Sequence, residues 1–351
     1  MGFPELSIII PTLNEAELLP LLLSDLLLQQ EINFEVIVTD GGSADATCTI
    51  ADEFFSTQQL TGLCVNGPKG RGRQLNAGVG VAKAEWLLFL HADSRLGDVL
   101  QLRTAVDFMK QHLERQPQQV IAGRFVLNFD TQGLADNFGF YFYEAKARLG
   151  RPGCIHGDQG MLISKTSMRE LGPFRQDLPV MEDTCFAEAV GACGQWLLLP
   201  GMITTSARRF QVEGFKTRQT LNALMMNFLA IGWLDFFVRA ENLYRQQDRT
   251  QPLPLLPFFQ LISDLLARMP RRQRWGIWYA TGGYVRSQAW QLGFALDCRQ
   301  AYRRGEDQGP RTTPWLNGFD RWFEPLTNHC PGRILTALLV RAWFAWQLGF
   351  R

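Results

Sequence analysis

The sequence predicts an α/β fold in which a mainly parallel sheet is covered by helices on both faces, followed by a mainly helical region. Near the start of the chain, short apolar runs alternate four times with segments of helical spacing, which is the pattern of a parallel sheet. One of these runs, 86–90, is apolar throughout, as a strand buried on both faces would be. Beyond residue 210, helical patterns separated by proline-rich or polar breaks replace the strands.

Each element is assigned from its own pattern. Apolar runs closed by turn residues predict strands at 6–10, 34–39, 62–65, 86–90, 120–129, 161–164 and 195–199. Apolar residues three and four positions apart predict helices at 18–30, 70–84, 99–116, 137–149, 182–191, 217–243, 255–269, 276–305 and 333–349. A further helix follows a cap at Ser43 or Asp45 and ends at Phe55. The change of pattern predicts two domains, residues 1–215 and residues 216–351.

Composition excludes several classes of protein. With 46% hydrophobic and 20% charged residues among 351, the chain is neither disordered nor a polytopic membrane protein. The seven cysteines show no CxxC and no zinc-ligand spacing, so we expect reduced thiols in a cytoplasmic protein. The N-terminal stretch lacks the basic and long apolar regions of a signal peptide.

The charge of the chain changes sign near residue 210. Residues 1–210 contain 17 Lys and Arg against 24 Asp and Glu, whereas residues 211–351 contain 18 against 10. Eight of the ten tryptophans also follow residue 210. Arg and Trp along helices favour peripheral contact with anionic lipid, which would place the protein at the inner face of the cell membrane. A helical domain with buried Trp and solvated Arg is the alternative.

Two polar segments follow the first two predicted strands. The segment 11–15, PTLNE, comes after the first, and 40–43, DGGS, comes after the second. Because carboxyl ends of parallel strands share one edge of a sheet, we expect the two segments to lie together. The glycines allow the backbone to approach a ligand closely, and Asp40 is an acceptor for a base N–H. A plain turn would explain DGGS taken alone.

A basic, glycine-rich segment and a polar strand end complete the predicted binding edge. The segment 69–78, KGRGRQLNAG, brings three cations to the start of a helix and suits a diphosphate. It is no dinucleotide fingerprint, because Leu75 stands where the third glycine belongs, and no P-loop is present. After the apolar strand at 86–90, Asp93 could hold a cation against a phosphate, or cap the next helix. His91 is a metal ligand, a phosphate donor or a packing residue.

The motifs PTLNEA, DGGSADAT, GRGRQLNAG and FLHADS, in this order, resemble the nucleotide-diphosphosugar-binding half of family 2 glycosyltransferases. The resemblance continues through GDQGMLIS, PVMEDT and SARRF and covers residues 5–215. Within the family, the chain is most similar to a small bacterial branch with HAD in place of the usual DxD, described as a radical-SAM/selenodomain-associated transferase. The resemblance implies the GT-A fold, a Rossmann-like αβα sandwich.

The resemblance also implies a nucleotide-sugar site. Thr12, Asn14 and Asp40 would line the base and ribose, and Arg73 would lie near the base and phosphates. Asp93 corresponds to the last acid of DxD, which binds a divalent metal, Mg²⁺ or Mn²⁺. His91 replaces the first acid and is the weaker metal candidate. The full nucleotide-sugar set is Pro11, Thr12, Asn14, Glu15, Asp40, Gly41, Arg73, Asn76, His91, Ala92 and Asp93.

Catalytic and acceptor-side residues follow in the same way. Glu182-Asp183 resembles the ED motif, in which the Asp is the general base for an acceptor hydroxyl; an acidic helix start is the alternative. The acceptor side would comprise Gly157, Asp158, Gln159 and Arg209. The segment 206–210, SARRF, departs from the QxxRW motif of processive synthases, which favours transfer of a single sugar.

Together these features predict an inverting glycosyltransferase that moves one sugar from a nucleotide-diphosphate sugar, first of all a UDP-sugar, to a hydroxyl acceptor. A lipid-linked acceptor is a hypothesis based on the Arg- and Trp-rich second half. A sugar-phosphate nucleotidyltransferase is one alternative, although such enzymes usually begin with a GxGTRL-type loop. A non-catalytic nucleotide-sugar-binding or scaffold protein is another. No nucleic-acid partner is expected.

Overall fold

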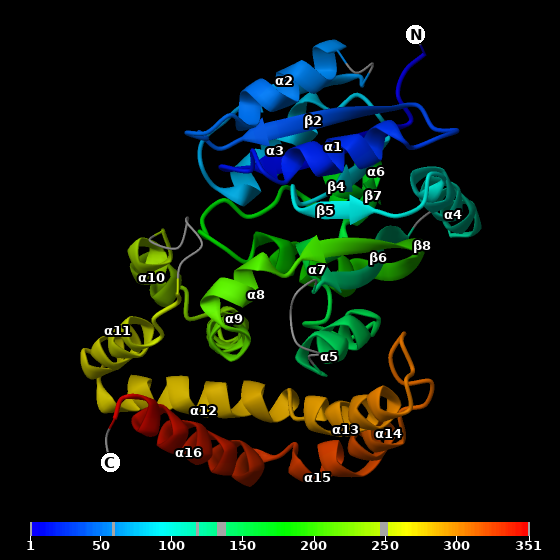
Figure 1. Cartoon of the computed structure of the whole chain (residues 1–351). Helices are drawn as coiled ribbons and strands as arrows, with labels where there is room; N and C mark the ends of the chain where they lie inside the picture. Colours follow the sequence, from blue (N-terminus) through cyan, green and yellow to red (C-terminus); the bar gives the residue numbers. More distant parts are fainter. Residues whose placement is uncertain (1, 58–59, 117–118, 132–137, 246–251, 350–351) are drawn as a thin grey trace. The chain divides into compact units, whose positions relative to one another are not determined.

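The computed structural model describes residues 2–57, 60–116, 119–131, 138–245 and 252–349 (Figure 1). The chain divides into two compact units. The first consists of Met1–Gln132 and Lys146–Ser206, and the second consists of Gly133–Ala145 and Ala207–Arg351. The division therefore falls before the predicted domain boundary at residue 215, and the second unit also takes a segment from the middle of the first.

A mixed sheet forms the centre of the first unit (Figure 1). Its strands, as far as the structure describes the chain, are β1 (Leu6–Thr12), β2 (Phe34–Asp40), β3 (Gly62–Asn66), β4 (Trp86–Phe89), β5 (Ser94–Leu96), β6 (Val120–Asp130), β7 (Met161–Ser164) and β8 (Gly194–Ser206). They lie in the order β3-β2-β1-β4-β7-β6-β8-β5. The first four strands are parallel, β7 is antiparallel to both its neighbours, β8 is parallel to β6, and β5 is antiparallel to β8.

Helices cover both faces of this sheet because side chains alternate along each strand. On β1, Ile8 and Ile10 belong to one buried cluster, which includes Leu19, Ala51 and Val106 from three helices on one face, whereas Ile9 belongs to a second cluster, which includes Leu75, Met168 and Phe186 from three helices on the other. The helices of this unit are α1 (Leu19–Leu27), α2 (Thr47–Thr57), α3 (Arg71–Val81), α4 (Gln101–Arg115), α6 (Lys165–Leu171) and α7 (Glu182–Cys193), with a 3₁₀ turn η1 (Gly157–Gln159). The predicted α/β sandwich with a mainly parallel sheet is confirmed.

The second unit is helical. Its helices are α5 (Phe138–Ala147), which ends in the first unit, α8 (Arg208–Glu213), α9 (Phe215–Ala230), α10 (Asp235–Arg245), α11 (Leu256–Ala267), α12 (Arg271–Ser287), α13 (Trp290–Arg303), α14 (Pro314–Gly318), the π-helix η2 (Phe319–Phe323), α15 (Glu324–Thr327) and α16 (Cys330–Gln347). Aromatic side chains pack within this unit: Phe140 contacts Phe210 and Phe215, and Phe344 contacts Phe259 and Trp278. The predicted helical region is confirmed.

Three predicted elements are wrong in extent. The helix expected at 217–243 is interrupted between α9 and α10, where Gly232 has a φ of 71°. The helix expected at 276–305 is broken between α12 and α13 around Gln288, although no glycine or proline marks the break. The strand expected at 195–199 continues to Ser206 in β8. In the part of the chain that the structure describes, no helix is both long and apolar enough to cross a bilayer.

Candidate functional site

The carboxyl ends of β1 and β2 are joined into one surface, as the sequence predicts. Thr12 and Asp40 are register partners, and the Thr12 hydroxyl donates to the Asp40 carboxylate at 3.0 Å. Asn14, whose φ of 57° is left-handed, accepts from the Ala44 N–H at 2.8 Å through its side chain. The loops that follow the two strands therefore hold each other in place.

The carboxylate of Asp40 already accepts hydrogen bonds from its own loop and from the neighbouring strand. Its carboxylate accepts from the N–H groups of Gly42 and Ser43 at 2.8 and 2.7 Å, and from the hydroxyls of Thr12 and Ser43. Burial opposes ionisation, but these four donors outweigh it and lower the pKa of Asp40. A carboxylate has about four acceptor sites, so a base N–H would have to replace one of these donors.

Gln74 connects these strand ends to α3 and was missed by sequence reasoning. Its buried amide donates to the carbonyl oxygens of Thr12 and Thr39, both at 2.7 Å. Gly41 lies against the same amide: a Cβ there would be 3.1 Å from it. The available signal was position, because Gln74 is one helical turn beyond the start of a helix that must pack on the sheet.

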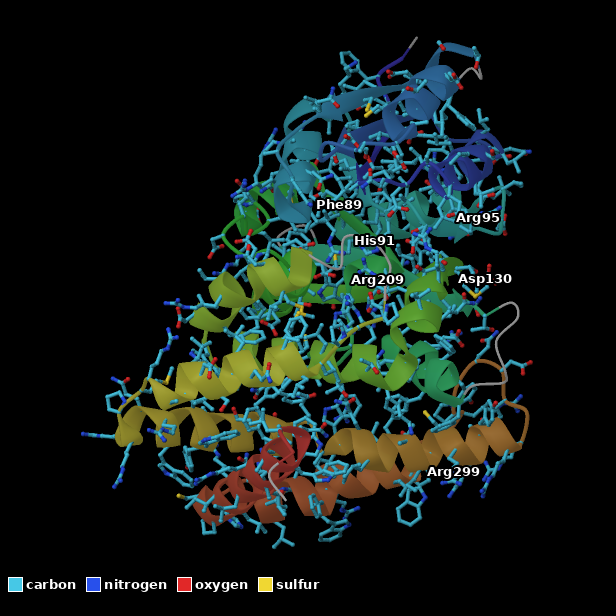
Figure 2. The ribbon with its side chains drawn as sticks, turned by 60° about the vertical axis from the view of Figure 1, so that its left-hand side comes forward. Phe89, His91, Arg95, Asp130, Arg209 and Arg299 are labelled. Carbon is cyan, nitrogen blue, oxygen red and sulfur yellow. The ribbon has the colours of Figure 1, made fainter. Side chains whose placement is uncertain are left out.

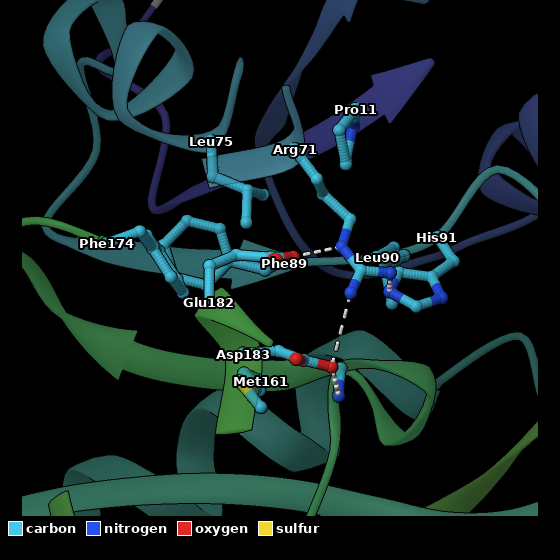
Figure 3. A pocket seen from close by; sticks show the side chains of 11 residues that line it. Pro11, Arg71, Leu75, Phe89, Leu90, His91, Met161, Phe174, Glu182 and Asp183 are labelled. Carbon is cyan, nitrogen blue, oxygen red and sulfur yellow. Dashed lines mark hydrogen bonds and ion pairs between the residues drawn. The ribbon is translucent and has the colours of Figure 1, made fainter. Parts of the chain in front are cut away.

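A small cavity lies between the end of β4 and the start of α7. Figure 3 shows its lining, in which the Arg71 side chain reaches from α3 toward Glu182, Asp183 and His91. With these side chains in place, the free volume of the cavity is about 10 Å³, enough for roughly one water molecule. Phe89, the last residue of β4, and His91, two positions further along, both line this cavity and are labelled in Figure 2.

Asp183 is buried and held as an anion. Its Oδ2 accepts from the Gly157 N–H at 3.0 Å, and Nη2 of Arg71 lies 3.5 Å from the same oxygen. Burial opposes ionisation, but Arg71, His156 and the Gly157 N–H together hold the pKa of Asp183 far below its usual range. The carboxylate is therefore available as a proton acceptor at neutral pH.

The surroundings of Asp158 shift its pKa in the opposite direction from that of Asp183. Burial, together with the charges of Asp183 and Asp93, raises its pKa to about 7. Its Oδ1 is buried and has no hydrogen-bond partner among the described residues. Two carboxyl groups of one site, Asp158 and Asp183, thus differ in protonation near neutral pH, a pattern common where acid–base chemistry occurs.

Arg124 supports the turn that carries Gly157 and Asp158, and sequence reasoning missed it as well. This fully buried side chain on β6 donates to the carbonyls of Ala147 and Leu149, at 2.5 and 3.0 Å, and to the side chain of Gln159 at 3.3 Å. Burial lowers the pKa of Arg124 to about 10. An arginine within the run 120–127, which is otherwise free of polar side chains, was the available signal, since a buried charge needs partners.

The predicted metal residues are one carboxylate and one imidazole near the cavity. Nε2 of His91 lies 3.5 Å from Nη1 of Arg71, so this imidazole faces a cation in this conformation. Asp93 is partly buried, and its charge acts on Asp158. Among the described residues, no group of three or more His, Cys, Asp and Glu side chains could hold a metal ion. One carboxylate still fits a Mg²⁺-type ion, which commonly takes its other ligands from phosphates and water.

The remaining predicted residues occupy varied positions. The side-chain amide of Asn76 pairs with the backbone N–H and carbonyl of Phe174, both at 2.9 Å, which gives it a structural task. Arg73 is exposed on α3, and Ala92 is buried. The backbone N–H of Glu15 donates to the Thr47 hydroxyl at 2.9 Å. Arg209 belongs to the second unit, where it pairs with Glu213 at 3.5 Å.

Comparison with known proteins finds a family model that matches much of the first unit. Residues 7–172 match the family model described as Glycosyl transferase family 2. A PGL/p-HBAD biosynthesis glycosyltransferase of Mycobacterium tuberculosis is 35% identical over 141 residues, which are 39% of this chain and 54% of the relative. Glycosyltransferase GlyG of Streptococcus pneumoniae is 25% identical over 171 residues, 48% of this chain and 51% of that protein. The chain spans about half the length of the curated relatives it matches.

Solved structures show a weaker likeness over more of the chain. The mannosyltransferase PcManGT from Pyrobaculum calidifontis, in complex with GDP-Man and Mn²⁺, has a TM-score of 0.49 and 16% identity, and the match covers 99% of this chain and 87% of that one. TarS from S. aureus, in complex with UDP, has a TM-score of 0.46 and 14% identity, with 90% and 91% covered. Likeness at this level bears on neither ligand nor mechanism, and these matches distinguish no branch within the family.

Proposed function

We propose that the protein, whose residues 7–172 match the family model Glycosyl transferase family 2, transfers one sugar from a nucleotide-diphosphate sugar to a hydroxyl acceptor. The observation that carries this proposal is the ionised, buried carboxylate of Asp183 in a cavity at the end of β4. The curated relatives, which are named glycosyltransferases, support the same reaction class. The departure of SARRF from QxxRW supports single transfer rather than polymerisation.

In this reaction Asp183 is the general base. It takes the proton of the acceptor hydroxyl as that oxygen forms its bond to the anomeric carbon, and the bond to the nucleoside diphosphate breaks on the opposite side. A single displacement of this kind inverts the anomeric centre. A positioned carboxylate contributes about 10²- to 10⁴-fold to such a proton transfer. Gly157 holds Asp183 through its N–H, and Arg124 supports the turn that contains Gly157.

The donor belongs at the joined ends of β1 and β2. Thr12, Asn14 and Asp40 are the candidates for the base and ribose, with UDP the first nucleotide to test. Asp93 is the candidate for holding a divalent metal, Mg²⁺ or Mn²⁺. When bound, such an ion neutralises charge on the departing diphosphate, an effect of several kcal/mol. His91 would then be a candidate hydrogen-bond donor to the phosphates rather than a metal ligand, because its ring lies beside the Arg71 cation.

The donor proposal predicts metal-dependent stabilisation by a nucleoside diphosphate. UDP, GDP and their sugar conjugates are screened by thermal shift with and without Mn²⁺ or Mg²⁺; a specific ligand at a hundredfold excess over its Kd adds about 2.7 kcal/mol of stability. We expect Asp93→Asn to weaken the metal-dependent part at least about tenfold, because it removes the carboxylate that holds the ion. Asp52→Asn, at an exposed position on α2, is the control. No shift with any nucleoside diphosphate would refute the proposal.

A lipid-linked acceptor is the finer proposal, and α16 supports it. On this helix Leu335, Leu339 and Trp346 are 61%, 62% and 68% exposed, and they fall on one face at helical spacing. Ala337 and Phe344, on the opposite face, are buried. An exposed apolar helix face of this kind is typical of attachment to a membrane surface.

The charged side chains on and near α16 indicate what kind of partner binds its exposed apolar face. Arg333 and Arg341 are exposed on α16, and the helix contains no Asp or Glu. Near its start Trp322 is 68% exposed and has the Arg321 guanidinium 5.0 Å from its ring centroid. Arginine beside tryptophan suits the boundary between acyl chains and anionic headgroups. We therefore propose an anionic bilayer as the partner of α16.

Vesicle flotation tests this partner. The full chain should float with vesicles of phosphatidylcholine and phosphatidylglycerol and less with phosphatidylcholine alone. Leu339→Glu should reduce binding at least about tenfold, since the insertion of one leucine is worth about 1.5–3 kcal/mol. Leu28→Glu is the matched control, because Leu28 is 61% exposed on the first unit. A wild-type chain that stays unbound, or a dimer that Leu339→Glu dissociates, would contradict a lipid surface.

A further inference from the structure

Arg71 is the shared partner of three side chains in the cavity. Its Nε pairs with Glu182, its Nη2 lies 3.5 Å from Oδ2 of Asp183, and its Nη1 lies 3.5 Å from Nε2 of His91 (Figure 3). Glu182 is almost completely buried, whereas 38% of the Arg71 side chain is exposed. The guanidinium thus enters from the solvent side and covers both carboxylates of the ED pair.

The position of this guanidinium conflicts with catalysis as proposed. A general base must lie within hydrogen-bond reach of the acceptor hydroxyl, and the anomeric carbon must lie next to that hydroxyl. The cavity beside Asp183 has room for about one water molecule while Arg71 occupies it. A sugar and an acceptor can therefore meet at Asp183 only after the Arg71 side chain has moved.

The backbone around Arg71 is held, so the side chain is the part that can move. A Cβ on Gly72 would be 2.2 Å from the carbonyl oxygen of Arg175, which shows how closely the start of α3 packs there. The arginine side chain, by contrast, has several rotatable bonds and already extends to the surface. His91, a candidate contact of the phosphates, lies 3.5 Å from this guanidinium, so rotation about the side-chain bonds could exchange the carboxylates for the phosphates.

We propose that Arg71 is a latch: its guanidinium pairs with Glu182 and Asp183 in the free protein and changes partner to the pyrophosphate when the nucleotide sugar binds. Release of the latch opens the space beside Asp183 and leaves that carboxylate free for the acceptor hydroxyl. The donor would then bind before the acceptor. This inference rests on the proposed function, because it takes Asp183 as the base.

Electrostatics favours such an exchange. Arg71, His156, His91 and the Gly157 N–H all act to keep Asp183 ionised, against its burial and the neighbouring carboxyls of Glu182 and Asp158. A base whose pKa is held this low is weak, so removal of the Arg71 charge strengthens it. A pyrophosphate is a stronger competitor for a guanidinium than one carboxylate, because it offers several charged oxygens in bidentate geometry.

The latch predicts that loss of its carboxylate partner improves donor binding. We expect Glu182→Gln to bind UDP with Mn²⁺ about tenfold more tightly in calorimetry, because Arg71 no longer has to leave a charged hydrogen bond. In an Arg71→Gln background the same change should have an effect of at most about twofold. Lys110→Gln, which breaks the pair with Glu5 outside the cavity lining, should leave affinity unchanged.

The outcomes separate the latch from the proposed function. If the wild-type chain binds neither UDP nor GDP, the proposed function fails and the latch fails with it. If it binds one of them but Glu182→Gln is no tighter, or gains equally in both backgrounds, only the latch is refuted. Asp183→Asn is the second variant if circular dichroism shows that Glu182→Gln does not fold. It breaks the 3.5 Å pair and should tighten binding about threefold, by the same reasoning.

Discussion

Asp183→Asn is expected to lower the rate of sugar transfer by about 10²- to 10⁴-fold, because an amide cannot take the proton of the acceptor hydroxyl. The side chains are almost equal in size, and the amide oxygen can still accept from the Gly157 N–H, so the fold should be retained. Binding of the nucleoside diphosphate should be retained, and tighter by about threefold because Arg71 loses one of its carboxylate partners. Release of nucleoside diphosphate in the presence of an acceptor measures the rate, and calorimetry measures the binding.

The control for this variant is Asp177→Asn. Asp177 is an exposed carboxylate shortly before α7, and it pairs with Arg175 at the surface. Its loss should change the rate less than about twofold, since exposed ion pairs contribute little. An unchanged turnover rate in Asp183→Asn would show that Asp183 is not the general base. A loss of nucleotide binding equal to the loss of rate would show that Asp183 holds the donor instead.

Gly157→Ala is the second variant with a large expected effect. A Cβ at this position would lie 2.9 Å from Nε2 of His91 and 3.1 Å from Oδ2 of Asp183, so one of these side chains must shift. Because misplacement of a catalytic group by about 1 Å can cost about 10²-fold in rate, we expect a loss of that order. Steady-state kinetics should show it mainly in kcat.

Gly150→Ala is the matched control, because it makes the same substitution in the loop between α5 and η1. A Cβ on Gly150 would have no heavy atom within 4 Å. Activity should therefore remain near that of the wild type, and stability should be equal or slightly higher. Comparable losses of activity in both variants would mean that this region tolerates no added side chain at either position. The close approach of Gly157 to His91 and Asp183 would then not be the cause of the loss.

The elements that sequence patterns predicted best are those with local signals. The strand at 161–164 has the predicted bounds, and the first four parallel strands were found because each is an apolar run closed by turn residues. The meeting of Thr12 with Asp40 followed from the geometry of parallel strands alone. The break between α12 and α13 was missed because helical periodicity continues through Gln288 without a glycine or proline.

The site was predicted only in part, because its finer assignments depend on contacts distant in sequence. Sequence patterns identified a basic segment at the start of α3, and the family resemblance singled out Arg73 within it for the base and phosphates, which stays a prediction. Arg71, from the same segment, is the residue that lines the cavity. Glu182, the carboxylate that pairs with Arg71, lies 111 positions further along the chain than Arg71. For Arg124 the sequence offered a charged residue among apolar ones, but its main partners are the backbone carbonyls of Ala147 and Leu149, which cannot be recognised from residue types.

The segment that leaves the first unit at residue 133 and returns at residue 146 has a consequence for how the chain can be divided. Phe138 and Tyr141 pack against Tyr302, and Phe140 packs against Phe210 and Phe215, all within the second unit. A gene truncated after β8 would therefore leave these rings without their neighbours, on a polypeptide that otherwise retains every residue of the cavity. The first unit is therefore not one continuous stretch of sequence, and a C-terminal half exchanged between related chains would have to include α5 as well.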